Sequence, residues 1–368
     1  MLIFLNGLYL LMFCLILLLV PKNLLNYPFA FKTLGFKYAL ISICIGAILL
    51  IFSVYFLLKT KDATQRYGYS VYSKLSFGTT GTIINMINMI SGCFFVCCIY
   101  FKLFGNIART LLLVFIQDKG QFYLKEEFLL IVIFFILLPL MFKKDISALS
   151  KYALIGIISI IIFIFSLIII FFYKLYNNEI PPLKEYQFEI NGSFKEIFES
   201  STAILNSFNF HSYIFPIYLP LKPRSTINMI KATSYAIITT SIIYILTGIF
   251  GFLMYREKIN DFLLKYFTND LLIYLKTSKF MVFIFIICEI GFFISTSLSM
   301  PLLFFACKSH FFNLVRFIKK KFFKKEKLFC DYVEIENFKE YMKGGYGKAN
   351  RKDAYVRGTC TNCSCIII

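Results

Sequence analysis

The stretch "YALIGIISIIIFIFSLIIIFFY", Tyr152 to Tyr173, carries no charged side chain over 22 consecutive residues. A second uncharged stretch, "YALISICIGAILLIFSVYFLL", runs from Tyr38 to Leu58. A helix needs roughly 20 apolar residues to cross the hydrocarbon core of a bilayer. A membrane β-barrel would instead show short segments of alternating polarity, so these blocks predict an all-α, polytopic membrane protein.

The composition of the whole chain supports this class. Hydrophobic residues make up 59% of the 368 residues and charged residues only 16%, and the mean hydropathy is +0.74. A soluble domain has about a quarter charged residues. The apolar stretches predict a transmembrane domain over residues 1–310 with short loops. Its eight predicted spans lie near 2–20, 38–58, 82–104, 127–142, 152–173, 197–219, 232–254 and 280–307.

The tail at 311–368 is predicted to be cytoplasmic. From Lys308 onward the chain has 14 basic and 6 acidic residues, and basic residues beside a span stay on the cytoplasmic side. The short loops give a weaker bias in the opposite direction, so the tail decides the predicted orientation. Because this basic run adjoins the membrane, it predicts attraction to anionic lipid and no binding of nucleic acid.

The sequence shows no enzymatic constellation. It has two histidines, no P-loop and no pair of acids inside the spans. The expectation is therefore a protein that is not an enzyme and that has neither a cofactor nor a bound metal.

Two predicted spans contain helix-breaking residues. One is "LLLVPKNLLNYPFAFKTLGF", residues 17–36, with Pro21 and Pro28. The other is "ILNSFNFHSYIFPIYLPLKPRS", residues 204–225, with His211 and two prolines. Inside a membrane a broken helix is tolerated only where it lines a cavity or is buried in protein. Breaks in the first and sixth spans, five spans apart, are typical of a transporter built from inverted repeats.

Five segments in register resemble the amino acid/auxin permease family, whose members include vacuolar and vesicular amino acid transporters. The resemblance runs from about residue 24 to 316, and each segment is weak evidence alone. The segments are "LLNYPFAFKTLG" (24–35), "ILLPLMFKKDISALSKYALIG" (136–156), "FNFHSYIFPIYLPLKPRS" (208–225), "YILTGIFGFLMYREKIND" (244–261) and "SMPLLFFACKSHFFNL" (299–314).

This resemblance implies a LeuT-like, APC-type inverted-repeat fold. The family has eleven helices and this sequence carries eight predicted spans, so the second repeat is expected to be incomplete. The implied activity is secondary active transport of amino acids by alternating access. Coupling is expected to protons, with Na+ as the other candidate ion, in the plasma membrane or a vacuolar or vesicular membrane.

Two other classes remain open from the sequence. One is a truncated, non-transporting homologue that acts as a membrane interaction or sensing protein. The other is an eight-span receptor or channel, which predicts no inverted repeat.

The resemblance also implies where substrate binds, between the first and sixth spans. The family carries a G-x-G step in its first helix, whose bare amides receive the substrate carboxylate, and this chain places Pro21 and Asn23 there. Proline has no N–H to donate, so this anion site is expected to be altered. The predicted substrate-binding residues are Asn23, Asn26, Asn206, Ser207, Phe208, Asn209 and His211.

Two ionisable residues of the spans have alternative interpretations. Glu289 is an acid well inside the last span, which predicts either proton coupling or a structural hydrogen bond to another helix. His211 is either a substrate or proton site in the broken sixth span, or a neutral histidine bonded to a neighbouring carbonyl.

Overall fold

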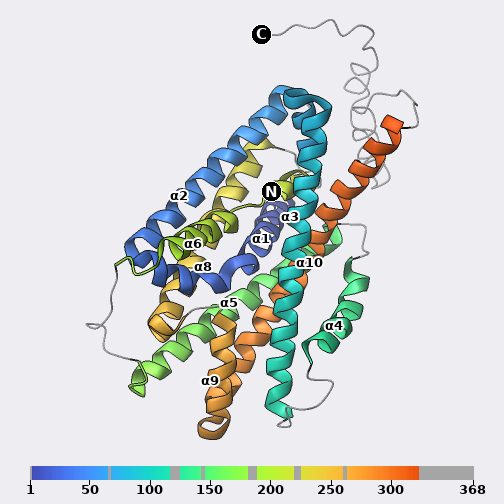
Figure 1. The fold of residues 1–368 in the computed structure, drawn as a ribbon. Helices are drawn as coiled ribbons and strands as arrows, with labels where there is room; N and C mark the ends of the chain where they lie inside the picture. The colour runs from blue at the N-terminus through green and yellow to red at the C-terminus, as the bar shows by residue number, and fades with distance from the viewer. Residues whose placement is uncertain are drawn as a thin grey trace, which may run out of the picture. The chain divides into compact units, whose positions relative to one another are not determined.

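The computed structural model describes residues 2–64, 68–116, 125–141, 146–180, 189–218, 225–259 and 263–322. In these residues every secondary-structure element is helical (Figure 1). The chain divides into two compact units, Met1–Leu314 and Val315–Ile368. The elements below belong to the first unit, apart from the last residues of the final helix.

The N-terminal elements form a broken helix. Helix α1 spans Leu2–Asn23, a short 3₁₀ turn, η1, follows at Leu24–Asn26, and α2 spans Tyr27–Thr64. Pro28 is the second residue of α2, where a missing N–H costs nothing because first-turn N–H groups have no partner within the helix. Gly35 has φ +72° and divides α2 into two helices, a conformation that glycine adopts without a steric penalty.

The next three helices are α3 at Tyr69–Phe115, α4 at Glu126–Met141 and α5 at Ile146–Tyr176. Gly78, with φ +65°, interrupts α3 near its start. Helix α4 begins with two glutamates, whose negative charge suits the positive end of the helix dipole.

A second broken helix follows. Helix α6 spans Phe194–Ser207, the 3₁₀ turn η4 spans His211–Tyr213 and α7 spans Ile214–Tyr218. Ser193 begins α6 with a capping box: its hydroxyl accepts from the Glu196 N–H, and the Glu196 carboxylate accepts from the Ser193 N–H at 2.8 Å. The hydrogen bond from that N–H is the main cause of a lowered pKa of the Glu196 carboxyl.

The last elements are α8 at Thr226–Tyr255, the 3₁₀ turn η5 at Arg256–Lys258, α9 at Leu263–Thr277 and α10 at Lys279–Phe322. Helix α10 therefore continues beyond the last predicted span, which ends at residue 307.

Among the residues that the structure describes, five helices are long and apolar enough to cross a membrane. They lie at Leu24–Thr64, Tyr69–Val114, Ala153–Tyr176, Thr226–Tyr255 and Lys279–Phe304. Large apolar side chains such as Phe56 (64% exposed) and Phe165 (63%) lie on their surfaces, which suits contact with lipid. The chain is an integral, multi-pass, all-helical membrane protein, as the composition predicts. The helices at the other three predicted spans are shorter, and their membrane crossing stays a prediction.

Glycines allow α8 to pack closely against α2, beside which it lies (Figure 1). A Cβ atom built on Gly248 would lie 2.4 Å from the Phe31 ring, and one on Gly251 would lie 2.4 Å from Pro28. Small residues at helix contacts let two backbones approach within the membrane, where van der Waals packing replaces the hydrophobic effect as the driving force. The α2–α8 contact therefore depends on Gly248 and Gly251 having no side chain.

The packing predicts that Gly248→Ala destabilises the protein by about 1–3 kcal/mol, because the added methyl group overlaps a fully buried ring. Thermal unfolding of the purified protein in detergent measures the effect. Gly92→Ala is the matched control, since a Cβ there meets no atom within 4 Å. Equal melting temperatures for the two variants would contradict this account of the contact.

Candidate functional site

The two helix breaks face each other across a narrow crevice, which in this conformation has no room for a water molecule. Helix α6 and the first part of α2 form its walls and the end of α1 completes it. The Thr33 and Ser200 hydroxyls, 2.7 Å apart, join the two walls further along the same helices. The lining residues are Asn23, Asn26, Tyr27, Ala30, Ala203, Ile204 and Ser207.

The lining of the crevice carries no charged side chain and combines three polar residues, Asn23, Asn26 and Ser207, with a mainly apolar surface. Asn23 and Ser207 are buried, and Asn26 is half-buried. The Ser207 hydroxyl donates to the Ala203 carbonyl at 2.8 Å. Each asparagine amide offers two N–H donors and a carbonyl acceptor. The arrangement can therefore hydrogen-bond a small molecule that presents both acceptors and donors.

Three of the residues predicted from the sequence come together here, and the others lie elsewhere. Asn23, Asn26 and Ser207 line the crevice. Phe208 is buried at the end of α6, where its ring fills the space beside Gly46. The side chains of Asn206 and Asn209 are exposed.

His211 contacts α2 and is not among the residues that line the crevice. Its Nε2 lies 2.5 Å from the Ser53 Oγ, and its Nδ1 lies 3.4 Å from the Asn209 Oδ1. One tautomer satisfies both contacts: Nδ1–H donates to the Asn209 carbonyl while Nε2 accepts from the Ser53 hydroxyl. His211 is thus held by two side chains, and the partners that the structure shows are not backbone carbonyls.

Sequence reasoning gave no role to the residue that touches both breaks, Tyr244 of α8. The Tyr244 hydroxyl donates to the Leu19 carbonyl of α1 at 2.6 Å. Its ring stacks on Tyr27 with centroids 4.2 Å apart and meets the edge of Phe208 at 5.8 Å. Tyr244 does belong to one of the five family-like segments, but nothing in that pattern indicated which helices it contacts.

The crevice lies far from both ends of α8. At 1.5 Å per residue, Tyr244 lies about 27 Å from Thr226 and about 17 Å from Tyr255 along the helix axis. The hydrocarbon core of a bilayer is about 30 Å thick. Polar clusters lie at both ends of α8, and Tyr244, whose ring stacks on the lining residue Tyr27, lies between them along the helix.

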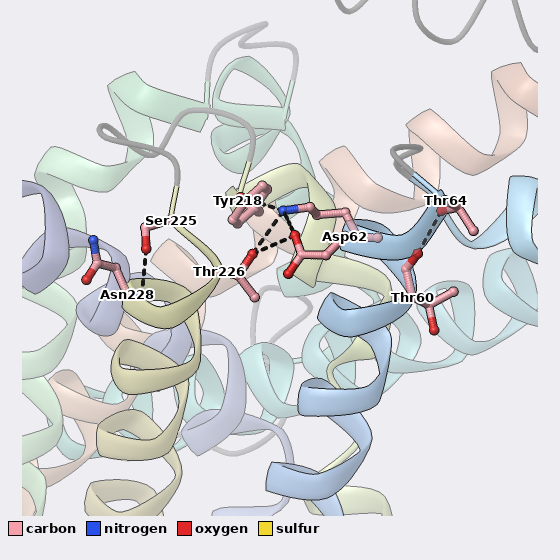
Figure 2. A network of polar contacts seen from close by, with 8 residues as sticks. Thr60, Asp62, Thr64, Tyr218, Ser225, Thr226 and Asn228 are labelled. Carbon is pink, nitrogen blue, oxygen red and sulfur yellow. Dashed lines mark hydrogen bonds and ion pairs between the residues drawn. The ribbon is translucent and has the colours of Figure 1, made fainter.

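The first of these clusters surrounds Lys61 at the start of α8 (Figure 2). The Lys61 amino group lies 2.6 Å from the Asp62 carboxylate and donates to the Tyr218 and Thr226 hydroxyls at 3.0 Å each. The Thr226 hydroxyl donates in turn to Asp62 at 2.9 Å. This Lys61 cluster (Lys61, Asp62, Tyr218, Thr226) connects the ends of α2 and α7 with the beginning of α8.

The second cluster surrounds Lys174 at the other end of α8. Lys174 of α5 pairs with Asp270 of α9 at 2.6 Å and lies 4.7 Å from the centre of the Tyr255 ring. The Tyr255 hydroxyl donates to the same carboxylate. This Lys174 cluster (Lys174, Tyr255, Asp270) joins α5, α8 and α9. Beside it, Tyr274 donates to Glu179, and burial is the main cause of a raised pKa of the Tyr274 phenol.

Glu289 is a fully buried acid on α10. Neither carboxylate oxygen has a hydrogen-bond partner among the residues that the structure describes. The neighbouring Cys288 thiol donates to the Phe163 carbonyl of α5 at 3.7 Å, so this part of α10 packs directly on α5. The structural alternative for Glu289, a hydrogen bond to another helix, finds no support in the described part of the chain.

These elements define a class: multi-pass helical membrane proteins in which two broken helices meet at an uncharged crevice. The sequence profile of the family described as "Transmembrane amino acid transporter protein" matches residues 11–352. The chain belongs to this family, which consists of transporters and not enzymes.

The chain is similar to several proteins that are named as amino acid transporters. It is 27% identical to amino acid transporter AVT6C of Arabidopsis thaliana, over 65% of this chain and 57% of that protein. It is 26% identical to putative sodium-coupled neutral amino acid transporter 8 of Xenopus tropicalis, over 67% and 58%. It is 24% identical to vacuolar amino acid transporter 2 of Saccharomyces cerevisiae, over 65% and 50%. The chain thus spans little more than half the length of these relatives.

The Lys61 cluster yields a stability prediction. We expect Lys61→Met to lower the stability by about 1–3 kcal/mol, because hydrogen bonds to a charged group are lost while Asp62 stays partly hydrated. Thermal unfolding in detergent measures the change. Lys276→Met is the control, since Lys276 is an exposed residue in the last turn of α9, outside the cluster. An unfolding temperature equal to that of the control would show that the cluster contributes nothing to stability.

Proposed function

We propose that this chain carries out secondary active transport of amino acids by alternating access, coupled to protons. The observation that carries the proposal is that two broken helices meet at an uncharged crevice whose lining includes Asn23, Asn26 and Ser207. Broken helices that meet near the midplane are the usual binding architecture of secondary transporters. Membership of a family of amino acid transporters supports the choice of substrate.

The proposed fold is LeuT-like. In it, α1, η1 and the first part of α2 form one broken helix, and α6, η4 and α7 form its counterpart in an inverted repeat. Both breaks have the same order of elements: a helix, a short non-helical or 3₁₀ segment, and a second helix with proline in its first turn. This likeness supports an inverted repeat that begins again at α6.

The proposed mode of recognition uses side chains. The Asn26 amide donates to the substrate carboxylate and accepts from its ammonium group, with Asn23 and Ser207 beside it in the crevice lining. Hydrogen bonds to ionised groups are about twice as strong as neutral ones. Side-chain amides suit this position because Pro21 offers no backbone N–H.

The proposed coupling group is Glu289. An ionised carboxylate without a partner is costly inside a membrane, so this group is held neutral and protonated while it is buried. When alternating access brings water to the group, it releases its proton. One proton crosses with each substrate, because the loaded carrier changes conformation only while Glu289 is protonated, whereas the empty carrier returns after the proton has been released, with the carboxylate in contact with water.

The names of the relatives support a membrane location without fixing the ion. One relative is named a vacuolar transporter and another is named sodium-coupled. We propose a vacuolar, vesicular or plasma membrane for this chain. Separate proton and Na+ gradients in the uptake experiment decide the coupling ion.

The full chain in proteoliposomes, tested with each of twenty labelled amino acids, provides the decisive experiment. We expect accumulation above equilibrium under a pH gradient, and its loss on addition of a protonophore. Asn26→Ala, in the crevice, should raise KM about tenfold, the effect of one lost hydrogen bond to a charged group. Asn206→Ala, at an exposed position, should leave KM unchanged.

The alternative outcomes are distinct. Binding of an amino acid without accumulation would favour the sensing protein over the transporter. Accumulation driven by a Na+ gradient alone would show that the coupling ion is Na+ and not the proton. Neither binding nor uptake of any amino acid would refute the proposed function.

Glu289→Gln tests the coupling separately. The amide keeps the size and polarity of a protonated carboxyl group but cannot release a proton, so exchange of labelled for unlabelled amino acid should continue while accumulation driven by a pH gradient is lost. Paired measurements of exchange and of net uptake check this expectation. Proton-driven accumulation at the wild-type level would remove Glu289 from the mechanism.

A further inference from the structure

Tyr244 lies at the point where the two broken helices come closest to α8. It is fully buried, and it is not among the residues that line the crevice. Its hydroxyl reaches Leu19 of α1, and its ring lies between Tyr27 and Phe208. One side chain thus contacts the segment before the first break, the segment after it and the end of α6.

Each of these contacts is near a lining residue in the chain. Leu19 lies one helical turn before Asn23. Tyr27 lines the crevice itself, and Phe208 directly follows Ser207. A displacement of the Tyr244 side chain would therefore move both polar walls of the crevice.

We infer that Tyr244 is a positioning residue, which fixes the end of α1 relative to the end of α6 and so sets the separation of the crevice's polar groups. The consequence for transport rests on the proposed function. The two parts of the side chain have separate tasks. The hydroxyl holds α1 through the Leu19 carbonyl, and the ring holds the start of α2 and the end of α6.

The hydroxyl is the part that an ordinary packing role does not explain. The ring stacking on Tyr27 is nearly parallel, with 17° between the planes, and a phenylalanine would preserve it. A backbone carbonyl can accept two hydrogen bonds, so Leu19 can take the tyrosine in addition to a bond within its own helix. The bond from Tyr244 is thus an added restraint between helices.

The first arm of the test measures transport by Tyr244→Phe in proteoliposomes. Loss of this restraint should raise the KM for the amino acid about tenfold, while kcat changes much less, because substrate groups no longer meet both walls at once. Tyr235→Phe on the same helix is the matched control, since that side chain is 57% exposed, and it should behave as the wild type. An unchanged KM in an active Tyr244→Phe variant would overturn the inference.

The second arm requires no transport. Ala203→Cys places a thiol in the crevice wall, and its rate of reaction with a water-soluble maleimide is followed by mass spectrometry of the peptide that contains residue 203. With Tyr244→Phe added, this rate should rise several-fold; with Tyr235→Phe added, it should stay the same. Equal rates in the two double variants would overturn the inference.

The two arms separate this inference from the proposed function. If the wild-type chain transports no amino acid, the proposed function fails and the thiol rates alone decide the role of Tyr244. If uptake is normal and the thiol rates are equal, the proposed function stands and Tyr244 is only a packing residue.

Discussion

The structure depends on how two interrupted helices are accommodated where water cannot hydrogen-bond the backbone. A helix break inside a membrane leaves polar groups that must find partners within the protein. Here the two breaks lie together, at η1 and just before η4, and α8 packs across them. The bare surface of α8 at Gly248 and Gly251 allows this approach, and Tyr244 supplies a hydrogen bond to α1 from the same helix.

The two polar clusters at the ends of α8 hold different helices and differ in hydration. In the Lys174 cluster the charged side chains are 9% and 15% exposed, whereas in the Lys61 cluster the Asp62 carboxylate is 41% exposed. An ionised group that already contacts water loses less interaction free energy when its partner moves away, because solvent screens its charge. Separation of partners therefore costs less at the Lys61 end. That end includes α7, the second half of the second broken helix, so the more easily separated contacts belong to the element that alternating access would move.

The positions of the breaks show how far local sequence rules reach. Prolines lie in the two segments where short 3₁₀ turns interrupt the helices, whereas Gly35 and Gly78 interrupt α2 and α3 with no proline at the break. The interruptions themselves lie ahead of Pro28 and Pro216, which occupy the first turns of the following helices. Proline suits a helix start because it needs no N–H partner there. Each proline therefore marks the first turn of the helix that follows the interruption, and the interruption itself lies a few residues earlier in the chain.

The sequence by itself determined that the chain is a multi-pass helical membrane protein, because the length of an apolar stretch is a local property. Proline is equally local, and it indicated the two broken segments to which Asn23, Asn26 and Ser207 belong. Only the tertiary structure decided which of the neighbouring polar residues face the crevice. Asn206 and Ser207 are adjacent, yet one is exposed and the other buried, since consecutive helical residues point about 100° apart and only the packed neighbours define the inner face. The same holds for Tyr244 and Leu19, which lie 225 positions apart in the chain. No local pattern encodes a contact between them, because it exists only once α8 has packed against α1.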